Sequence, residues 1–426
     1  FHQHNYGSLQ DVTVRSPDAS FRGVRGIDLN TNQPGPGLIR NVYVQGFEYA
    51  AYTPQNYYSL TFKNVNISDQ KAYGLFNWNN QYFLRNFQRV NSVPAIRNNN
   101  DSSLTVVVDS ELLGGSANEP AIVNFGSILL RDVNTEGYRA PVEPFPTDNL
   151  AEYVAEFAQG AEFVGNGPFG GFNVRNGGIG PEYATKTTLD LPVESAPAIT
   201  EDPVSQWVRA ADVPGDDTAS IQVAIDFAAA NNLTTVYFSP QQSDSTYIIS
   251  NTIRVHGSVR RLLGSGATLH YSAPNQQNPT RVAFPANASM FKLDASLDGT
   301  LVFENFIIAF EAPSTYATNY LFEDRSINPV VVRNVGVNSG KAYRNFAPGK
   351  KLFLEDVTAS AWEFSLGQSV WARQLNTESQ FGLGTNIIND GSTLWVLGLK
   401  HEYIETLLDG ALDDRPMTEK SLKVMQ

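Results

Sequence analysis

The sequence predicts an all-β protein built from two tandem right-handed parallel β-helices, with a short capping helix before the second. Three observations support this fold class. A short phrase recurs at steps of about 18 to 30 residues, each copy alternates apolar and polar residues as a strand does, and an Asn or Asp usually stands beside the apolar anchor. The anchors are Val12, Val42, Val65, Phe87 and Val133 in the first set, and Phe306, Val335, Val357 and Leu375 in the second.

The first repeat set is expected over residues 1–140. One step, from Phe87 to Val133, covers 46 residues and is interpreted as two coils of 23. The polar residue beside each anchor is expected to stack on its copies in neighbouring coils. Because this set begins without a capping helix, we expect self-association or a missing N-terminal segment to cover its first coil.

Residues 141–212 differ in composition, with prolines spread throughout and Gly-rich segments such as Gly165–Gly167. Aromatic residues offer anchors for packing, so the stretch is interpreted as an ordered connection between the two domains.

The second β-helix is expected over residues 213–426. A capping helix near 217–230 is indicated by an apolar face at helical spacing (Ile221, Ala224, Ile225 and Ala228), with Asp217 or Thr218 as N-cap. Strand-like segments follow at Thr235–Phe238, Tyr247–Ile249 and Thr252–Val255.

Composition limits the function classes. The net charge is −13 and the isoelectric point about 4.9, which argues against nucleic acid or an anionic membrane as partner. There is no cysteine, and the five histidines show no metal-ligand spacing. We therefore expect no cofactor and no metal. A polar surface with few charges suits a secreted or cell-surface protein that binds polysaccharide.

Specific phrases resemble a known family. The run Gly215–Gln222, followed by Val236–Phe238, Tyr247–Ile249 and Gly264, resembles the opening of a pectate-lyase-superfamily β-helix domain. Further phrases resemble bacterial tandem β-helix proteins described as glycoside hydrolase family 28-related and similar in layout to family 55: Pro36–Val42, Val93–Asn98, Val370–Asn376 and Leu394–Lys400. The resemblance covers nearly the whole chain. It implies a pectin-lyase-like fold and exo-acting, inverting hydrolysis of β-1,3-glucan.

Glycoside hydrolysis needs two carboxyl groups that flank the scissile bond. Glu378 and Glu402 are 24 residues apart, about one coil, and each ends a strand-like phrase. The resemblance to family 55 implies that Glu402 is the general acid and that Glu378 helps to hold the water. Stacked positions lie about 4.8 Å apart, whereas inverting enzymes hold the carboxyls about 6.5–9.5 Å apart, so the two side chains must splay. Both can equally be surface glutamates at coil corners. Weaker candidates are Glu405, Glu363 and Asp390.

The residues beside Glu378 and Glu402 include some that favour a catalytic pocket and some that count against it. His401 adjoins Glu402 and can shift its pKa, but His401 and Tyr403 place bulk where the related phrase has small residues, which counts against an intact pocket. Asn376 and His401 are candidates for substrate binding beside the pair. Trp78 and Tyr82, set among amides, are candidates for stacking on sugar rings, whereas Trp371 and Trp395 are expected to stack inside the helix.

Two function classes remain open. The first is an extracellular glycoside hydrolase acting on a neutral glucan such as β-1,3-glucan. The second is a non-catalytic surface, matrix or filament-forming protein, or a carbohydrate-binding adhesin, on the same scaffold. A tailspike-like depolymerase, marked by trimer formation, is a third option. For a calcium-dependent lyase site, Asp324 and Arg325 with Glu323 are a candidate fragment.

Overall fold

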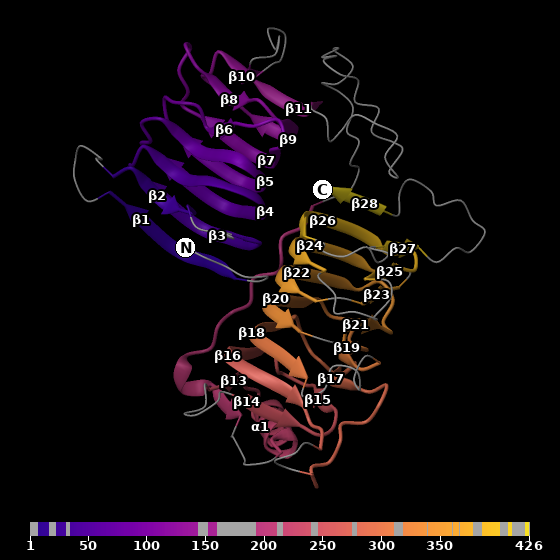
Figure 1. The fold of residues 1–426 in the computed structure, drawn as a ribbon. Coiled ribbons are helices and arrows are strands. Elements are labelled where there is room, and N and C mark those ends of the chain that lie inside the picture. Colours follow the sequence, from indigo (N-terminus) through magenta and orange to yellow (C-terminus); the bar gives the residue numbers. More distant parts are fainter. Residues whose placement is uncertain are drawn as a thin grey trace. The chain divides into compact units, whose positions relative to one another are not determined.

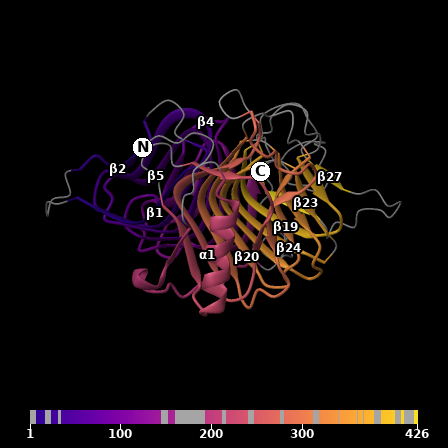
Figure 2. The ribbon, with the colours of Figure 1, turned by 90° about the horizontal axis from the view of Figure 1, so that it is seen from below.

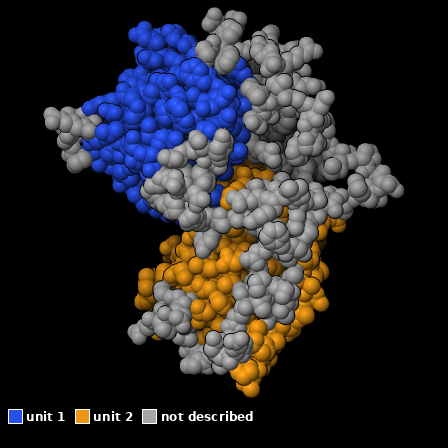
Figure 3. Space-filling view, viewed as in Figure 1, with its two compact units in different colours: residues 1–190 blue, residues 191–426 orange. Residues whose placement is uncertain are grey.

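A computed structural model shows how these phrases fold. It describes residues 7–16, 23–30, 35–143, 152–159, 193–210, 216–239, 246–274, 279–310, 318–338, 340–359, 361–365, 367–377, 386–400, 408–410 and 422–425. The chain divides into two compact units, residues 1–190 and 191–426 (Figures 1 and 3). Each unit has its own buried apolar core.

Unit 1 is a stack of parallel strands (Figure 1). One column of strands carries the anchors; it consists of β1 (Ser8–Arg15), β3 (Gly37–Gln45), the second halves of β4 (Tyr49–Ser68) and β5 (Tyr73–Val90), β7 (Leu104–Leu113) and β9 (Ser127–Asn134). A second column consists of β2 (Arg25–Asp28), the first halves of β4 and β5, β6 (Ile96–Asn98), β8 (Pro120–Asn124) and β10 (Ala140–Glu143). β4 and β5 are long because each runs through both columns.

The register explains the 46-residue step in the anchors. β7 lies between β5 and β9 and brings Ser110 opposite Val133. Ser110 therefore occupies the anchor position of the coil that the apolar pattern missed, and its hydroxyl accepts a hydrogen bond from the Phe87 N–H at 3.1 Å. The interpretation of this step as two coils is confirmed.

Unit 2 contains two parallel sheets and a helix. The first sheet is β12 (Val208–Ala210), β13 (Thr235–Phe238), β14 (Thr246–Ile249), β16 (Arg261–Tyr271), β18 (Leu301–Phe310), β20 (Val330–Val337), β22 (Lys351–Thr358), β24 (Ser369–Asn376), β26 (Thr393–Lys400) and β28 (Leu422–Met425). The second is β15 (Ile253–Val255), β17 (Ser289–Leu293), β19 (Tyr320–Asp324), β21 (Lys341–Asn345), β23 (Trp362–Phe364), β25 (Ile387–Asn389) and β27 (Leu408–Gly410). Successive coils pair in parallel, so the predicted all-β architecture of two parallel β-helices is confirmed.

Helix α1 (Thr218–Ala230) packs against β12, β13 and β15 at one end of unit 2 (Figure 2). Its buried residues are the four predicted from spacing, Ile221, Ala224, Ile225 and Ala228. Asp217 is the N-cap residue, as predicted, but its side chain makes no capping hydrogen bond to the helix. The Asp217 carboxylate accepts from the Ile248 N–H at 2.7 Å instead of capping the helix, and Asp216 accepts from the Thr218 N–H at 2.9 Å. Asp217 thus ties the helix to β14.

The predicted connection over residues 141–212 is divided between the units, because the division falls after residue 190. Its first part supplies β11 (Tyr153–Gln159), which pairs antiparallel with β9 and ends the sheet of unit 1. Its last part supplies the 3-10 turn Val204–Gln206 and β12, which pairs with β13 of unit 2.

Candidate functional site

A group of partly exposed aromatic rings covers the outer side of the second strand column of unit 1. We call it the aromatic face: Tyr49, Tyr52, Tyr73, Phe76, Trp78 and Phe125. Parallel register produces it, because Tyr49 is opposite Tyr73 and Tyr52 is opposite Phe76 on neighbouring strands. Ala51 and Leu75 point into the core, and the next residue on each strand, Tyr52 and Phe76, points outward, as the alternation of a strand requires.

Neighbouring rings are nearly parallel within the set Tyr52, Phe76 and Trp78 and within the pair Tyr49 and Tyr73, whereas Tyr49 is inclined by 75° to Phe76. Tyr52 and Phe76 have centroids 4.9 Å apart with an interplanar angle of 18°. Phe76 and Trp78 are 6.3 Å apart at 26°, and Tyr49 and Tyr73 are 6.3 Å apart at 24°. Trp78 is 42% exposed and Phe125 is 50% exposed. Tyr52 contacts both Arg25 and Phe76, and Phe76 contacts both Tyr52 and Trp78. Trp78, at the end of this stack, is therefore the ring that a sugar ring can cover.

Two arginines hold the rings in place. The Arg25 guanidinium carbon lies 4.0 Å from the centroid of Tyr52, and its Nη1 is 3.0 Å from the Asp28 carboxylate. Arg97 lies 5.1 Å from the Tyr73 centroid and 5.7 Å from that of Phe125, and its Nη1 donates to the Tyr73 hydroxyl at 2.6 Å. Such cation–π contacts stabilise each ring by about 0.5–1 kcal/mol at exposed sites.

The Tyr49 hydroxyl keeps its proton at neutral pH. Partial burial, and then the negative charge of Glu48, raise the pKa of Tyr49 above its usual value. The Tyr49 hydroxyl therefore stays protonated and can donate to a sugar hydroxyl.

Trp78 and Tyr82, both expected to bind sugar, lie in different environments. Tyr82 is fully buried in the core, where its hydroxyl contacts the Thr53 hydroxyl and donates to the Phe76 carbonyl at 3.2 Å. The expectation that Tyr82 stacks on substrate is therefore corrected: its ring packs beneath the surface. Tyr82 is four residues after Trp78 and on the same strand, so sequence spacing alone could not separate the two.

The proposed acid pair lies just beyond the described strands. Glu378, His401 and Glu402 are outside the described residues. The strands that precede the two glutamates are β24 and β26, which pair with Asn376 opposite Lys400, and the Thr377 N–H donates to the Lys400 carbonyl at 2.9 Å. Asn376 itself is buried, at 1% exposure, which does not support a direct contact with substrate.

Of the other candidate carboxylates, Glu363 and Asp324 are bound to neighbouring side chains, and Asp390 lies at the surface. Glu363 contacts the Tyr320 hydroxyl and lies 3.1 Å from Lys341 Nζ. Asp390 is exposed. Asp324 is fully buried and paired with Lys350, and its Oδ2 accepts from the Tyr343 hydroxyl at 2.9 Å. Asp324 and Glu323 therefore face opposite sides of β19 and do not converge as the lyase fragment required.

Trp371 and Trp395 are in register, as their spacing predicted, but not inside the helix. They alternate with the core residues Val370, Ala372, Leu394 and Val396, so they lie on the outer side of the sheet. Trp371 stacks on Phe353 at 5.0 Å and 13°. Both tryptophans are buried there, at 4% and 1% exposure.

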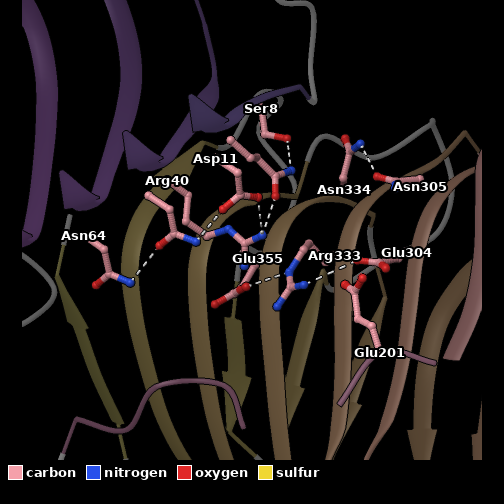
Figure 4. Close-up of polar contacts among 12 residues, drawn as sticks. Ser8, Asp11, Arg40, Asn64, Glu201, Glu304, Asn305, Arg333, Asn334 and Glu355 are labelled. Carbon is pink, nitrogen blue, oxygen red and sulfur yellow. Dashed lines mark hydrogen bonds and ion pairs between the residues drawn. The ribbon is translucent and has the colours of Figure 1, made fainter. Parts of the chain in front are cut away.

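A ladder of buried ion pairs on this same side of unit 2 was not predicted from the sequence. The residue two positions before each anchor alternates in charge, through Glu304, Arg333, Glu355 and Arg373, and parallel pairing places the four side by side. Figure 4 shows Arg333 between Glu304 and Glu355; the distances are 3.3 Å from its Nη1 to Glu304 and 2.9 Å from its Nε to Glu355. These four residues belong to the repeated phrases, so the alternation of charge can be recognised in the amino-acid sequence.

An extended segment borders the ladder at both ends. Arg373 donates through Nη2 to the Glu194 carbonyl, and the Glu194 carboxylate is 2.7 Å from Lys351 Nζ. At the other end Arg261 lies 2.6 Å from Glu304 and 3.4 Å from Glu201. Every carboxylate of the ladder is thus paired with a cation, which makes the ladder structural and leaves none of its carboxylates available for acid–base chemistry.

Among the residues that the structure describes, no group of three histidines or carboxylates could hold a metal ion. No helix in the described part of the chain is long and apolar enough to cross a membrane.

Comparison with known proteins adds little beyond this geometry. No family model matches the chain, and no curated protein matches it. One solved structure that is similar is a variant of sacteLam55A from Streptomyces sp. SirexAA-E in complex with glucose; it has 11% sequence identity and a TM-score of 0.40, and the match covers 94% of this chain and 82% of that chain. Similarity at this level carries no functional conclusion.

Proposed function

We propose that this protein is an extracellular polysaccharide-active β-helix protein that binds a neutral glucan, such as β-1,3-glucan, on the aromatic face of unit 1. The observation that carries the proposal is the stack of Tyr52, Phe76 and Trp78, with rings parallel to within 18° and 26°. Exposing apolar rings to water costs free energy. Exposed rings that arginines hold in a fixed orientation therefore indicate a recognition surface. The net charge of −13 agrees with an uncharged ligand.

Titration calorimetry with laminarin oligosaccharides tests the binding. We expect Trp78→Ala to weaken affinity about threefold to tenfold, because an aromatic stacking contact contributes about 0.5–1.5 kcal/mol. Phe227→Ala is a matched control, since Phe227 is a 54% exposed ring on α1 of unit 2. Equal affinity of the wild type and Trp78→Ala would refute binding at this face.

Hydrolysis is the second candidate function, and one observation favours it. Asn376 and Lys400 are opposite one another on β24 and β26, so Glu378 and Glu402 each follow a strand end by the same number of residues. We propose Glu402 as the general acid and Glu378 as the residue that helps to hold the water for an inverting reaction.

Reducing-sugar release from laminarin tests this second function. Glu402→Gln should abolish release while circular dichroism stays unchanged, and binding at the aromatic face should persist. Unchanged release by Glu402→Gln removes the assignment. A protein that binds glucan but releases no sugar in wild-type form is instead the non-catalytic adhesin or matrix component, for which filament formation is checked by light scattering.

A further inference from the structure

One arginine of unit 1 occupies an interior position of the β-helix. Parallel pairing places Val44, Ile67, Arg89 and Leu112 in register on β3, β4, β5 and β7. The three aliphatic residues belong to the apolar core of unit 1, and Arg89 is only 1% exposed. Arg89 therefore points into the core, at a position where the coils on either side have a hydrocarbon side chain.

The Arg89 guanidinium finds no hydrogen-bond acceptor among the residues that the structure describes. Its Nε, Nη1 and Nη2 atoms are all buried and without an acceptor there, although a guanidinium has five N–H donors. Burial lowers the pKa of Arg89 to about 9, and no described carboxylate opposes this effect. The group keeps its charge at neutral pH, so a cation lies in the core without a counter-charge, which is costly because water no longer solvates it.

The side chains near Arg89 compensate for this charge only in part. The centroid of the Tyr138 ring lies 5.3 Å from the guanidinium carbon, a cation–π contact. The Tyr138 hydroxyl, however, donates to the Val93 carbonyl at 2.9 Å. The Asn91 amide, two residues along the chain from Arg89, donates to Gln70 at 2.8 Å. The N–H donors of Arg89 thus need an acceptor that these side chains do not supply.

The burial of Arg89 limits what that acceptor can be. A carboxylate or phosphate on a sugar, nucleotide or peptide cannot reach a side chain enclosed by the coils, whereas a monatomic ion can be enclosed as the coils fold. An anion with one charge balances the single charge of the guanidinium, and it costs less to remove from water than a divalent anion does. Hydrogen bonds between ionised partners are also the strong ones. Chloride meets these requirements.

We propose that Arg89 binds one chloride ion inside the core of unit 1. The ion accepts hydrogen bonds from the guanidinium, and the aliphatic side chains of the adjacent coils, Ile67 and Leu112, shield it from water. The stability of unit 1 therefore depends on chloride. The site uses no residue of the aromatic face, so it goes beyond the glucan binding proposed there and does not depend on it.

Thermal unfolding of the full chain tests the site. Sodium chloride replaces sodium gluconate at a constant ionic strength of about 0.15 M, so that the screening of surface charges stays equal. We expect the melting temperature to rise by about 5–10 °C when chloride reaches about 100 mM. A shift of this size corresponds to a dissociation constant of about 1 mM for an ion that binds only the folded state.

Three variants show whether the response depends on Arg89. Arg89→Leu gives this coil the same kind of side chain as its neighbours, so it should fold, and its melting temperature should not respond to chloride. Arg89→Lys keeps the charge with fewer donors and should respond more weakly than the wild type. Arg139→Gln is the matched control and should respond as the wild type does, because it removes an exposed arginine of unit 1 that is paired with Glu143 at 2.7 Å.

Bromide, a heavier halide, locates the ion directly. Anomalous diffraction from crystals of the wild type grown in sodium bromide should show one peak beside the Arg89 guanidinium. The proposal is overturned if chloride does not change the melting temperature of the wild type, if Arg89→Leu responds as strongly as the wild type, or if no bromide peak lies beside Arg89. Ordered water in place of that peak would assign the donors of Arg89 to buried water instead.

Discussion

At the level of single residues, the Asn or Asp beside each anchor has two roles. The first was expected: side-chain amides form a ladder, with Nδ2 of Asn64 donating to Asn41 at 3.0 Å and Nδ2 of Asn86 donating to Asn64 at 3.0 Å. The second was not: these residues adopt left-handed backbone conformations, with φ of 53° at Asn41 and Asn64 and 50° at Asn334. Asn and Asp tolerate this region better than other non-glycine residues, which explains their recurrence.

Substitution of Asn64 separates the two roles. Asn64→Ala loses two hydrogen bonds and strains a left-handed residue, so we expect a loss of about 2–4 kcal/mol in the free energy of unfolding. Asn64→Gly loses the same bonds without the strain and should cost less. Urea unfolding of the two variants gives the comparison, and equal losses would show that backbone conformation contributes nothing.

The buried pair Asp324 and Lys350 gives a pH-dependent prediction. Burial raises the pKa of Asp324 despite Lys350, and both side chains are fully buried. Lys350→Met leaves the carboxylate without its cation, so we expect a loss of about 3–5 kcal/mol at pH 8. A carboxyl with a raised folded-state pKa stabilises at low pH and loses that stability as pH rises through this pKa.

The variant Lys350→Met should therefore approach the wild type near pH 4 and fall behind it as the pH increases. Urea unfolding at pH 4, 6 and 8 measures this difference. A deficit that does not depend on pH would mean that Asp324 is not the group responsible.

At the level of strands and sheets, the ion ladder lies on the outer side of the first sheet of unit 2 and pairs charged residues of neighbouring strands. Glu355 is fully buried between Arg333 and Arg373. Glu355→Gln removes the carboxylate shared by Arg333 and the fully buried Arg373, and Arg333 keeps only Glu304, so we expect a loss of about 3–5 kcal/mol. The matched control is Asp298→Asn, whose partner Arg260 lies 3.3 Å away and is 47% exposed, and it should cost less than about 1 kcal/mol.

Thermal unfolding of both variants compares a buried pair with an exposed one. Similar melting temperatures for Glu355→Gln and Asp298→Asn would contradict a stabilising role for the ladder. Added salt screens the exposed Arg260–Asp298 pair and screens buried pairs much less. If the exposed pair contributes to stability, added salt should therefore reduce the difference in melting temperature between Asp298→Asn and the wild type.

For the molecule as a whole, charge predicts colloidal behaviour. The net charge of −13 repels other copies at neutral pH, and this repulsion vanishes near the isoelectric point of about 4.9. Light scattering between pH 4 and 8 should show association that peaks near pH 5. A peak above pH 7 would indicate assembly by a specific surface, as expected for a filament-forming protein.

Local patterns in the sequence were sufficient for the coils, their anchors and helix α1. They succeed because each coil repeats the same apolar alternation, and because α1 buries a face that is visible at 3.6-residue spacing. They failed for Tyr82, which shares a strand with Trp78 but points into the core. They also failed for Trp371 and Trp395, whose spacing revealed the register but not the side of the sheet.

The repeat, the two β-helices and the polar ladder follow from the amino-acid sequence alone, since all of these arise from contacts between equivalent positions one coil apart in the chain. Which side chains meet on a surface became visible only in the folded structure. The aromatic face joins residues 49 to 125, and the ion ladder joins residues 304 to 373. In a parallel β-helix, positions about 20 to 30 residues apart become neighbours about 4.8 Å apart. A surface site is therefore composed of residues that carry no signal until the register is known.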